Sequence, residues 1–310
     1  MDFHHLENIV CIAEEKSLAK AAEKRFVTQS ALNQQLQKLE SELGTPLFSR
    51  IRSNWTPTDA GRIYINAAKE MLLMRKEVYD RIGDLADRNQ RHLTVGLIPE
   101  RGVEMFTAVY PAFHEAYPEV RMEPRECAVR DMQKEISEGI MDLGLATLQD
   151  DQKDENQYHL LAEEEILLAV PSEHDLSAGG SRFPKEAPVT DLERFEDMPF
   201  IRIYERSTLF EITERLFARA GFTPKELFST ASNISKYRIT ETGLGCALLP
   251  ETYALSEGNV VYFKLHEHPV WQITLCSRKG GYLGKPEQTF IRLCRDYWTG
   301  RVSGAIPAWT

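Results

Sequence analysis

Residues 58–88 carry an apolar side chain at every third or fourth position, which predicts one long helix that begins at Thr58. The apolar positions are Ile63, Ala67, Met71, Met74, Val78, Ile82 and Leu85. Such a helix would be about 46 Å long, so most of it would have no domain of its own to pack against. We therefore expect it to pair, nearly straight, with a second copy of itself. Packing against the C-terminal part of the chain is the alternative.

The composition is that of a globular protein with about two domains. The chain has 310 residues, of which 42% are hydrophobic and 27% are charged, and these values exclude disordered and collagen-like proteins. No apolar run is long enough to span a membrane, and the N-terminal residues lack a basic start followed by an apolar stretch. We therefore expect a cytoplasmic protein.

Three shorter helices are predicted before the long one. Apolar spacing predicts the first over residues 3–15, Ser17 is a good N-cap for the second, and Thr28 caps the third. The third helix runs to about Leu43 and stops at Gly44. Its apolar side chains lie on one face and are Leu32, Leu36, Leu39 and Leu43.

The opposite face of the third helix carries short uncharged polar side chains, namely Ser30, Asn33, Gln34 and Gln37. Solvated helix faces usually favour Lys and Glu, which are better helix formers. Asn and Gln can present a donor and an acceptor together, as contact with an adenine edge requires. Composition alone supports base contact and a plain solvated face equally.

Residues 47–58 predict two short extended segments around a turn. Arg50 and Arg52 alternate with other residues along the first segment, so their side chains should point the same way. They could contact phosphates or could be ordinary surface arginines.

Charge is distributed unevenly along the chain, because residues 1–91 have a net charge of +1 and the remainder has −11. A polyanion would therefore be tolerated only at the N-terminal end.

The order of these N-terminal features resembles the winged helix-turn-helix of LysR-type transcriptional regulators. The similar segments are Ala21-Ala22, Thr28-Gln29-Ser30-Ala31-Leu32, Gln35-Leu36-Gln37-Lys38-Leu39-Glu40, Leu43-Gly44, Leu47-Phe48-Ser49-Arg50 and Thr58-Asp59-Ala60-Gly61. The resemblance implies sequence-specific binding of double-stranded DNA by Thr28, Gln29, Ser30, Asn33, Gln34, Gln37 and Lys38 of the recognition helix and by Arg50 and Arg52 of the wing. The family usually has serine at Thr28, proline at Ser30 and often arginine at Ser53.

The C-terminal two thirds alternate between predicted strands and helices, which implies a parallel sheet with helices on both faces. The predicted strands are 93–98, 120–125, 142–146, 166–170, 200–203, 226–230, 246–249, 260–265 and 270–276. The predicted helices are 103–117, 129–137, 208–220, 234–242 and 286–298. We expect two α/β subdomains, between which the chain crosses near residues 162–166 and 264–268. The run Glu163-Glu164-Glu165 is interpreted as solvated.

This part is similar to the effector-binding domain of the same regulators, which has two Rossmann-like subdomains and the architecture of periplasmic solute-binding proteins. The similar segments are Tyr117-Pro118-Glu119-Val120, Gly139-Ile140-Met141-Asp142-Leu143-Gly144 and Gly243-Leu244-Gly245-Cys246-Ala247-Leu248-Leu249-Pro250. The predicted domains are therefore a DNA-binding domain over 1–58, a linker helix over 59–90 and an effector-binding domain over 91–301. Subdomain I would comprise about 91–162 and 266–301, and subdomain II about 163–265.

Ligands of open α/β folds bind beyond the carboxyl ends of the strands. This rule and the resemblance together predict an effector site at Pro99, Glu100, Arg101, Val129, Thr147, Tyr204, Arg206 and Asn233. Because arginine binds carboxylates with two hydrogen bonds, Arg101 and Arg206 suggest a small organic anion as the effector. Ile98 and Glu100 stand where the family often has Ser or Thr, and Glu100 would oppose an anion unless it pairs with Arg101.

The sequence gives little support for a redox, metal-binding or catalytic site. Five cysteines are far apart in the sequence, and Cys127 and Cys246 near the cleft are better interpreted as bystanders than as redox sensors. His266 and His268 have no visible third ligand for a metal. We predict no catalytic residues and no cofactor. An α/β enzyme with an unrelated helical extension is the alternative class of protein.

The resemblance favours a dimer of dimers as the oligomer and is compatible with RNA polymerase as a further partner.

Overall fold

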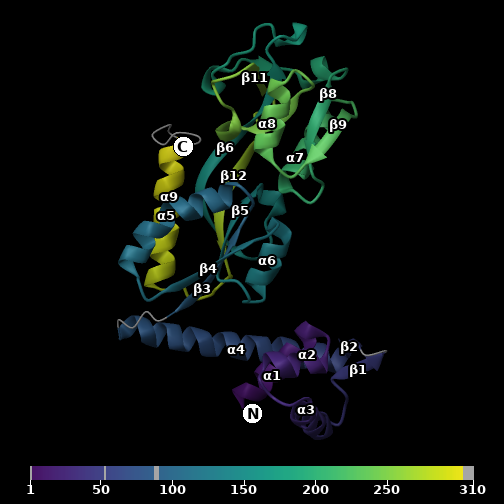
Figure 1. Cartoon of the computed structure of the whole chain (residues 1–310), viewed down its shortest axis with the longest axis vertical. Helices are drawn as coiled ribbons and strands as arrows, with labels where there is room; N and C mark the ends of the chain where they lie inside the picture. Colours follow the sequence, from purple (N-terminus) through teal and green to yellow (C-terminus); the bar gives the residue numbers. More distant parts are fainter. Residues whose placement is uncertain (1, 52–53, 87–90, 303–310) are drawn as a thin grey trace. The chain divides into compact units, whose positions relative to one another are not determined.

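The computed structural model describes residues 2–51, 54–86 and 91–302, which form two compact units over 1–88 and 89–310 (Figure 1). Among the described residues, no helix is long and apolar enough to cross a membrane.

The first unit is a cluster of three helices followed by a two-stranded wing and a long helix. Its elements are α1 Phe3–Glu15, α2 Leu18–Lys24, α3 Gln29–Leu43, β1 Phe48–Ile51, β2 Asn54–Pro57 and α4 Asp59–Leu85. The three predicted N-cap hydroxyls each accept a backbone N–H, at Lys20 for Ser17, at Ala31 for Thr28 and at Gly61 for Thr58. Local capping chemistry therefore fixes where these helices begin.

Two details of this unit differ from the sequence-based prediction. Leu43 is exposed, because α3 extends beyond the core at its last turn. The long helix ends at Leu85 rather than near residue 88, and its 27 residues give a length of about 40 Å. Leu85 is also the last apolar residue of the predicted seam, so no further apolar face favours continuing the helix.

The second unit is an α/β structure whose central sheet runs through two lobes. Its first elements are β3 His92–Leu97, α5 Arg101–Ala116, β4 Arg121–Glu126, α6 Val129–Ser137, β5 Leu143–Leu148 and β6 Gln157–Pro171. They are followed by β7 Val189–Thr190, β8 Pro199–Ile203, α7 Thr208–Arg219, β9 Lys225–Thr230, α8 Asn233–Glu241, β10 Ala247–Pro250, β11 Val260–Leu265, β12 Val270–Ser277 and α9 Lys285–Val302. A short 3-10 turn, η5 Glu251–Tyr253, follows β10.

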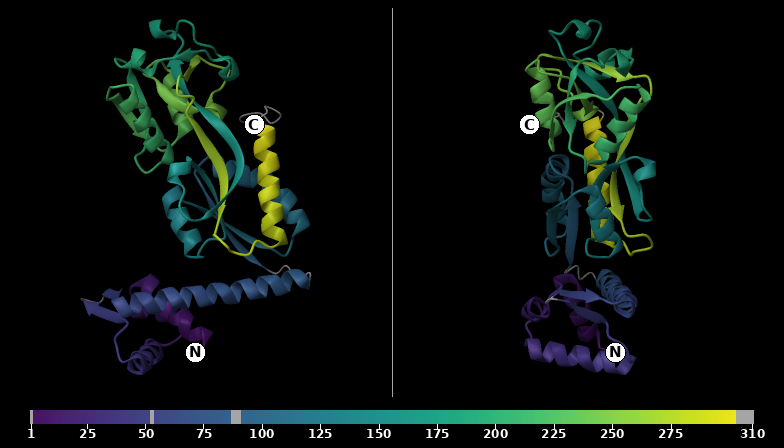
Figure 2. Two further views of the ribbon diagram at one scale, coloured as in Figure 1. Left: turned by 180° about the vertical axis from the view of Figure 1, so that it is seen from behind. Right: turned by 90° about the vertical axis from the view of Figure 1, so that its right-hand side faces the viewer.

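The strands of the central sheet lie in the order β4-β3-β5-β12-β6-β11-β7. The prediction of a parallel sheet is wrong, because this sheet contains both parallel and antiparallel pairs. β3 pairs with β4 and β5 in parallel, whereas β12 is antiparallel to both β5 and β6. The chain enters the second lobe along β6 and returns along β12, so these two strands must run in opposite directions (Figure 2).

β6 is the strand that joins the two lobes. Its first part, residues 157–165, pairs with β12, and its last part, 166–171, pairs with β10 and β11. The sequence predicted only the buried last part as a strand, because the first part lacks a continuous apolar run. The crossing predicted near 162–166 therefore lies within a continuous strand.

Helices cover both faces of the sheet in each lobe. In the first lobe, α5 and α9 pack on one face through Phe113, Phe290 and Trp298, and α6 packs on the other through Met132. In the second lobe, α7 and α8 belong to two separate core clusters. α9 runs beyond the predicted residue 298 because Arg301 of its last turn bonds to Glu104 and to the Tyr297 hydroxyl.

Candidate functional site

The predicted polar face of α3 is solvent-accessible in the structure. Leu32 and Leu36 anchor the opposite face in the core, where they are 1% and 0% exposed. The exposed residues of the predicted set are Thr28, Gln29, Ser30, Gln34, Gln37 and Lys38, and Asn33 is half-buried. α3 thus presents amide and hydroxyl groups to solvent from a rigidly packed backbone.

A polar network that the sequence did not predict fixes the orientation of α3. Asn8 of α1 donates to Gln35 Oε1 at 2.7 Å and accepts from Arg25 Nε at 3.0 Å. Glu7 accepts hydrogen bonds from Arg25 and from Arg75 of α4. Burial raises the pKa of the Glu7 carboxyl, but these two hydrogen bonds outweigh burial and leave the pKa below its ordinary value. The network thus ties four helices together.

The wing is held to α3 and α4 by its own contacts. Glu40 Oε1 accepts from the backbone N–H of Leu47 at 2.7 Å and of Phe48 at 3.3 Å. A Cβ at Gly61 would lie 1.9 Å from the Leu47 carbonyl oxygen, so only glycine permits this approach of α4 to the wing. The predicted phosphate contacts fall outside this description, because Arg52 and the side chain of Arg50 lie outside the described part of the chain.

The predicted seam of α4 is exposed along most of its length. Met74, Ile82 and Leu85 are 68%, 56% and 87% exposed, while Ile65 and Ala68 on another face of α4 are buried in the core of the first unit. A groove of about 1170 Å³, open to solvent, lies along α1 and α4. Its apolar lining includes Phe3, Leu6, Met71, Met74, Val78 and Tyr79.

A cleft between the two lobes of the second unit contains every predicted effector-site residue. It encloses about 530 Å³ of space that is partly open to solvent. The predicted residues that line it are Pro99, Glu100, Arg101, Val129, Thr147, Tyr204, Arg206 and Asn233. Ile98, Cys127, Tyr253 and Trp271 add apolar and aromatic surface to the lining. The carboxyl-end rule for open α/β folds therefore located the cleft.

Glu100 makes a contact across this cleft. Its carboxylate accepts a hydrogen bond from the Ser232 hydroxyl and one from the backbone N–H of Asn233 at 3.2 Å. Glu100 precedes α5 in the first lobe, whereas Ser232 caps α8 in the second. Glu100 does not pair with Arg101, because the two side chains have different partners.

Arg101 is buried against groups of this chain. It is 3% exposed, and its guanidinium bonds to both carboxylate oxygens of Glu164 and to the Thr252 hydroxyl. Glu164 also accepts from Trp271 Nε1. The interpretation of Glu163-Glu164-Glu165 as a solvated run is therefore wrong for Glu164. Its partner lies 63 residues away in the sequence, so no local pattern could have revealed the pair.

Arg206 is also paired, but at the surface. Its guanidinium lies 2.8 Å from the Asp131 carboxylate, and its side chain is 70% exposed. Such an exposed pair contributes little to stability and exchanges readily with other anions.

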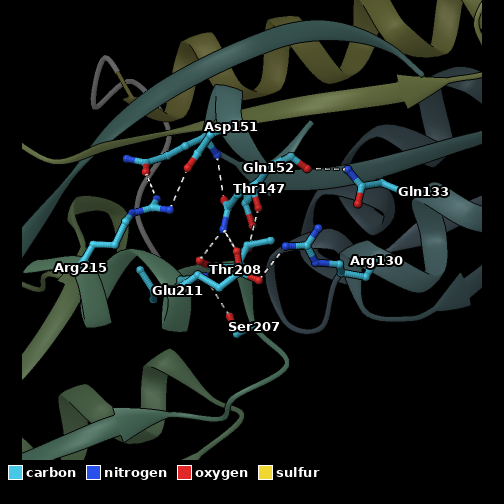
Figure 3. Close-up of polar contacts among 11 residues, drawn as sticks. Arg130, Gln133, Thr147, Asp151, Gln152, Ser207, Thr208, Glu211 and Arg215 are labelled. Carbon is cyan, nitrogen blue, oxygen red and sulfur yellow. Dashed lines mark hydrogen bonds and ion pairs between the residues drawn. The ribbon is translucent and has the colours of Figure 1, made fainter. Parts of the chain in front are cut away.

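The start of α7 is bonded to the first lobe beside the cleft (Figure 3). The Thr208 hydroxyl donates to the Thr147 carbonyl at 2.7 Å, and Gln152 Nε2 donates to Glu211 at 2.7 Å and to the Thr208 carbonyl at 3.1 Å. Arg130 also bonds to Glu211 at 2.7 Å. These contacts hold the two lobes together on the α7 side of the cleft.

Cys127 lines the cleft, whereas Cys246 lies in the core of the second lobe and not at the cleft as predicted, and neither thiol is activated. Burial and the neighbouring Glu135 raise the pKa of the Cys127 thiol to about 11, and burial raises that of Cys246 to about 12. A redox sensor requires a lowered thiol pKa. His266 and His268 contact different carboxylates, Asp191 at 3.4 Å and Glu165 at 2.7 Å.

Comparison with known protein families accounts for both units. A model of the bacterial regulatory helix-turn-helix proteins of the lysR family matches residues 3–62, and a model of the LysR substrate binding domain matches 86–299. The chain belongs to the LysR family. Its members are DNA-binding transcription regulators whose second domain binds a small effector, so this chain is a regulator and not an enzyme.

Curated relatives of the LysR family cover nearly the whole chain. The HTH-type transcriptional regulator YcgK of Bacillus subtilis (strain 168) is 26% identical over 307 residues, which are 96% of this chain and 94% of that protein. The Hca operon transcriptional activator HcaR of Escherichia coli (strain K12) is 25% identical over 250 residues, which are 81% and 82% of the two chains.

Solved LysR-family structures share the fold of the full chain. A variant of full-length OxyR from Pseudomonas aeruginosa superposes with a TM-score of 0.68 and 21% identity, covering 96% of this chain and 94% of its own. Full-length BenM has a TM-score of 0.56 and 21% identity, with 99% of both chains covered. These similarities confirm the winged helix-turn-helix and the two-lobed α/β domain.

Proposed function

We propose that α3 reads base edges in the major groove and that the wing contacts phosphates. The base-reading set is Thr28, Gln29, Ser30, Asn33, Gln34, Gln37 and Lys38, and the phosphate contacts are Arg50 and Arg52. The observation that carries the proposal is the exposed amide face of α3. An amide offers a donor and an acceptor together, which matches the N6 and N7 atoms of adenine.

The exposed seam of α4 supports pairing of two chains. Burying side chains such as Met74, Val78 and Ile82 removes apolar surface from water, at about 25 cal/mol for each Å². A dimer formed through α4 would present two copies of α3 to two half-sites in successive major-groove turns. Contacts between effector domains would then join two such dimers into a tetramer.

A small effector would bind in the cleft beside Val129, Thr147 and Tyr204. The prediction of an organic anion rested on Arg101 and Arg206, and both guanidinium groups already contact carboxylates of this chain. An anionic effector would therefore bind by exchange with Glu164 or Asp131. Effector binding would shift the equilibrium between cleft conformations in proportion to its differential affinity for them.

Regulation would take place at promoters in the cytoplasm, where a bound dimer of dimers can contact RNA polymerase. The test is selection of bound fragments from a random DNA library by the purified full-length chain at near-physiological salt. Enrichment of one interrupted, roughly palindromic site is expected. Weak, salt-sensitive binding with no enriched site would refute sequence-specific DNA reading by α3.

A further inference from the structure

We propose that Glu100 is an internal ligand of the effector cleft and determines which effectors the cleft accepts. Its carboxylate occupies the position at the start of α8 that a carboxylate-bearing molecule would otherwise take. This inference rests on the proposed effector role of the cleft and adds a chemical class to it. A small carboxylate fits at the start of α8 only when the Glu100 side chain is removed.

The contacts of Glu100 are those of a bound carboxylate. One oxygen accepts from the Ser232 hydroxyl, and the other accepts from the Asn233 N–H at 3.2 Å. The two donors are the N-cap residue and the first residue of the nine-residue helix α8. Backbone N–H groups at a helix start favour anions. Because these donors lie in the opposite lobe, Glu100 joins the two lobes as a bridging ligand would.

A buried lysine lies one turn further along α8. Lys236 is 1% exposed, and its ammonium donates to the Leu248 carbonyl and to Asn233 Oδ1 at 3.3 Å. Burial lowers the pKa of Lys236 to about 7, and the negative charge of Glu100 opposes that shift. A hydroxyl and a backbone N–H therefore bind this one carboxylate, and the buried Lys236 lies one turn further along the same helix.

The backbone of Glu100 is held in an unfavourable conformation. Its φ of 60° and ψ of −82° place it at the centre of a γ-turn, which the Arg101 N–H closes to the Pro99 carbonyl at 2.8 Å. A non-glycine residue with this φ costs free energy and persists only when its surroundings hold it. Here the contacts of Glu100 across the cleft and of Arg101 with Glu164 hold the turn from both sides.

The other charged groups of the cleft lining, Arg101 and Arg206, already contact carboxylates of this chain. Arg101 is buried in its bonds with Glu164, and Arg206 is paired with Asp131. The rest of the lining contributes apolar and aromatic surface from Val129 and Tyr204 and the polar group of Thr147. In the wild-type cleft, Glu100 therefore excludes a second carboxylate from the start of α8, and an anion can enter elsewhere only by exchange with Glu164 or Asp131.

The test is chemical rescue of Glu100→Ala by acetate in the full-length chain. This truncation removes a group of the size of acetate. We expect sodium acetate to raise the Tm of the variant by about 2–4 °C in a saturable way, relative to sodium chloride at equal ionic strength. Wild type should respond equally to the two salts, because its own carboxylate fills the position. Ser232→Ala in the same background should abolish the difference.

Two further variants keep the test decisive. Glu205→Ala removes a carboxylate from an exposed residue of the neighbouring loop and should show no acetate effect. Glu100→Ser provides a second truncation if Glu100→Ala does not fold. Equal responses of both Glu100 variants to acetate and chloride would overturn the proposal, as would an acetate effect of the same size in wild type or Glu205→Ala.

Selection from random DNA with the same protein samples separates the two proposals. If no sample selects a DNA site but acetate still stabilises Glu100→Ala, DNA reading by α3 is refuted. The proposal for Glu100 is then unaffected. Intact DNA selection without acetate rescue would refute the internal ligand alone.

Discussion

The two units of this LysR-family regulator use their polar side chains in opposite ways. On α3, Gln34 and Gln37 are exposed to solvent from a helix whose other face is locked in the core. In the effector cleft, Glu100, Arg101 and Arg206 all contact groups of the same chain. A surface with exposed polar groups can meet its partner directly, whereas a cleft with internal pairs must exchange them.

This difference predicts where substitutions act. Removing an exposed amide from α3 should weaken binding and spare stability, because few internal contacts are lost. Removing the buried Arg101 from the cleft should lower stability, because its partner Glu164 stays behind in a buried position.

The largest expected effect is that of Arg101→Met. Glu164 would be left buried without its charge partner, which costs about 3–5 kcal/mol in the free energy of unfolding. Urea unfolding followed by tryptophan fluorescence measures this loss. The control is Arg101→Met combined with Glu164→Met, which removes both charges and should recover much of it. If the double variant were no more stable than the single one, internal pairing would not explain the burial of Arg101.

The next largest effect should follow from a charge in the α4 seam. Val78→Glu would place a carboxylate in the proposed dimer contact and remove about 1.5–3 kcal/mol of apolar burial per chain. The dimer dissociation constant, measured by analytical ultracentrifugation, should rise at least tenfold. Asn66→Glu adds the same charge at an exposed position of α4 outside the seam and should leave it unchanged. Equal effects of the two variants would contradict pairing through this seam.

Gln34 and Gln35 are adjacent residues of one type with different surroundings. Gln34 is exposed, so Gln34→Ala should weaken binding to a selected DNA site by about 1–3 kcal/mol and leave the Tm within error. Gln35 accepts from Asn8, so Gln35→Ala should lower stability by about 1 kcal/mol. Gel-shift titration and thermal unfolding of both variants check this pair, and a reversed pattern would contradict the assignment of the two faces.

The smallest effect concerns the pH dependence of stability. Burial lowers the pKa of Lys236 to about 7 in the folded chain from its ordinary value of 10.5, so the unfolded state binds the extra proton between these values. Stability from this group therefore rises with pH above 7, by up to about 1.4 kcal/mol per pH unit. Lys236→Met should remove this rise between pH 7 and 8.5. A wild-type slope equal to that of the variant would show that Lys236 does not titrate there.

Features set by neighbouring residues were predictable from the sequence. Ser17, Thr28 and Thr58 were identified as caps because an N-cap bonds to a backbone group two or three residues away. The positions of the cleft loops followed from where buried strands end. Both rules require only local information.

Features set by distant parts of the chain were not predictable. The first half of β6 is a strand only because β12 pairs with it, from Glu165 opposite Val270 to Gln157 opposite Ser277. Glu164 appeared solvated until Arg101 was placed beside it by the fold. The partner of Glu100 likewise comes from a helix 133 residues later in the sequence.

The central claim is that the exposed face of α3 reads DNA bases. Its most direct test is random-library selection repeated with Gln34→Ala and compared with wild type. The account predicts the same overall site, with relaxed base preference at one position in each half-site. An identical motif with full preference at every position would contradict base reading by Gln34.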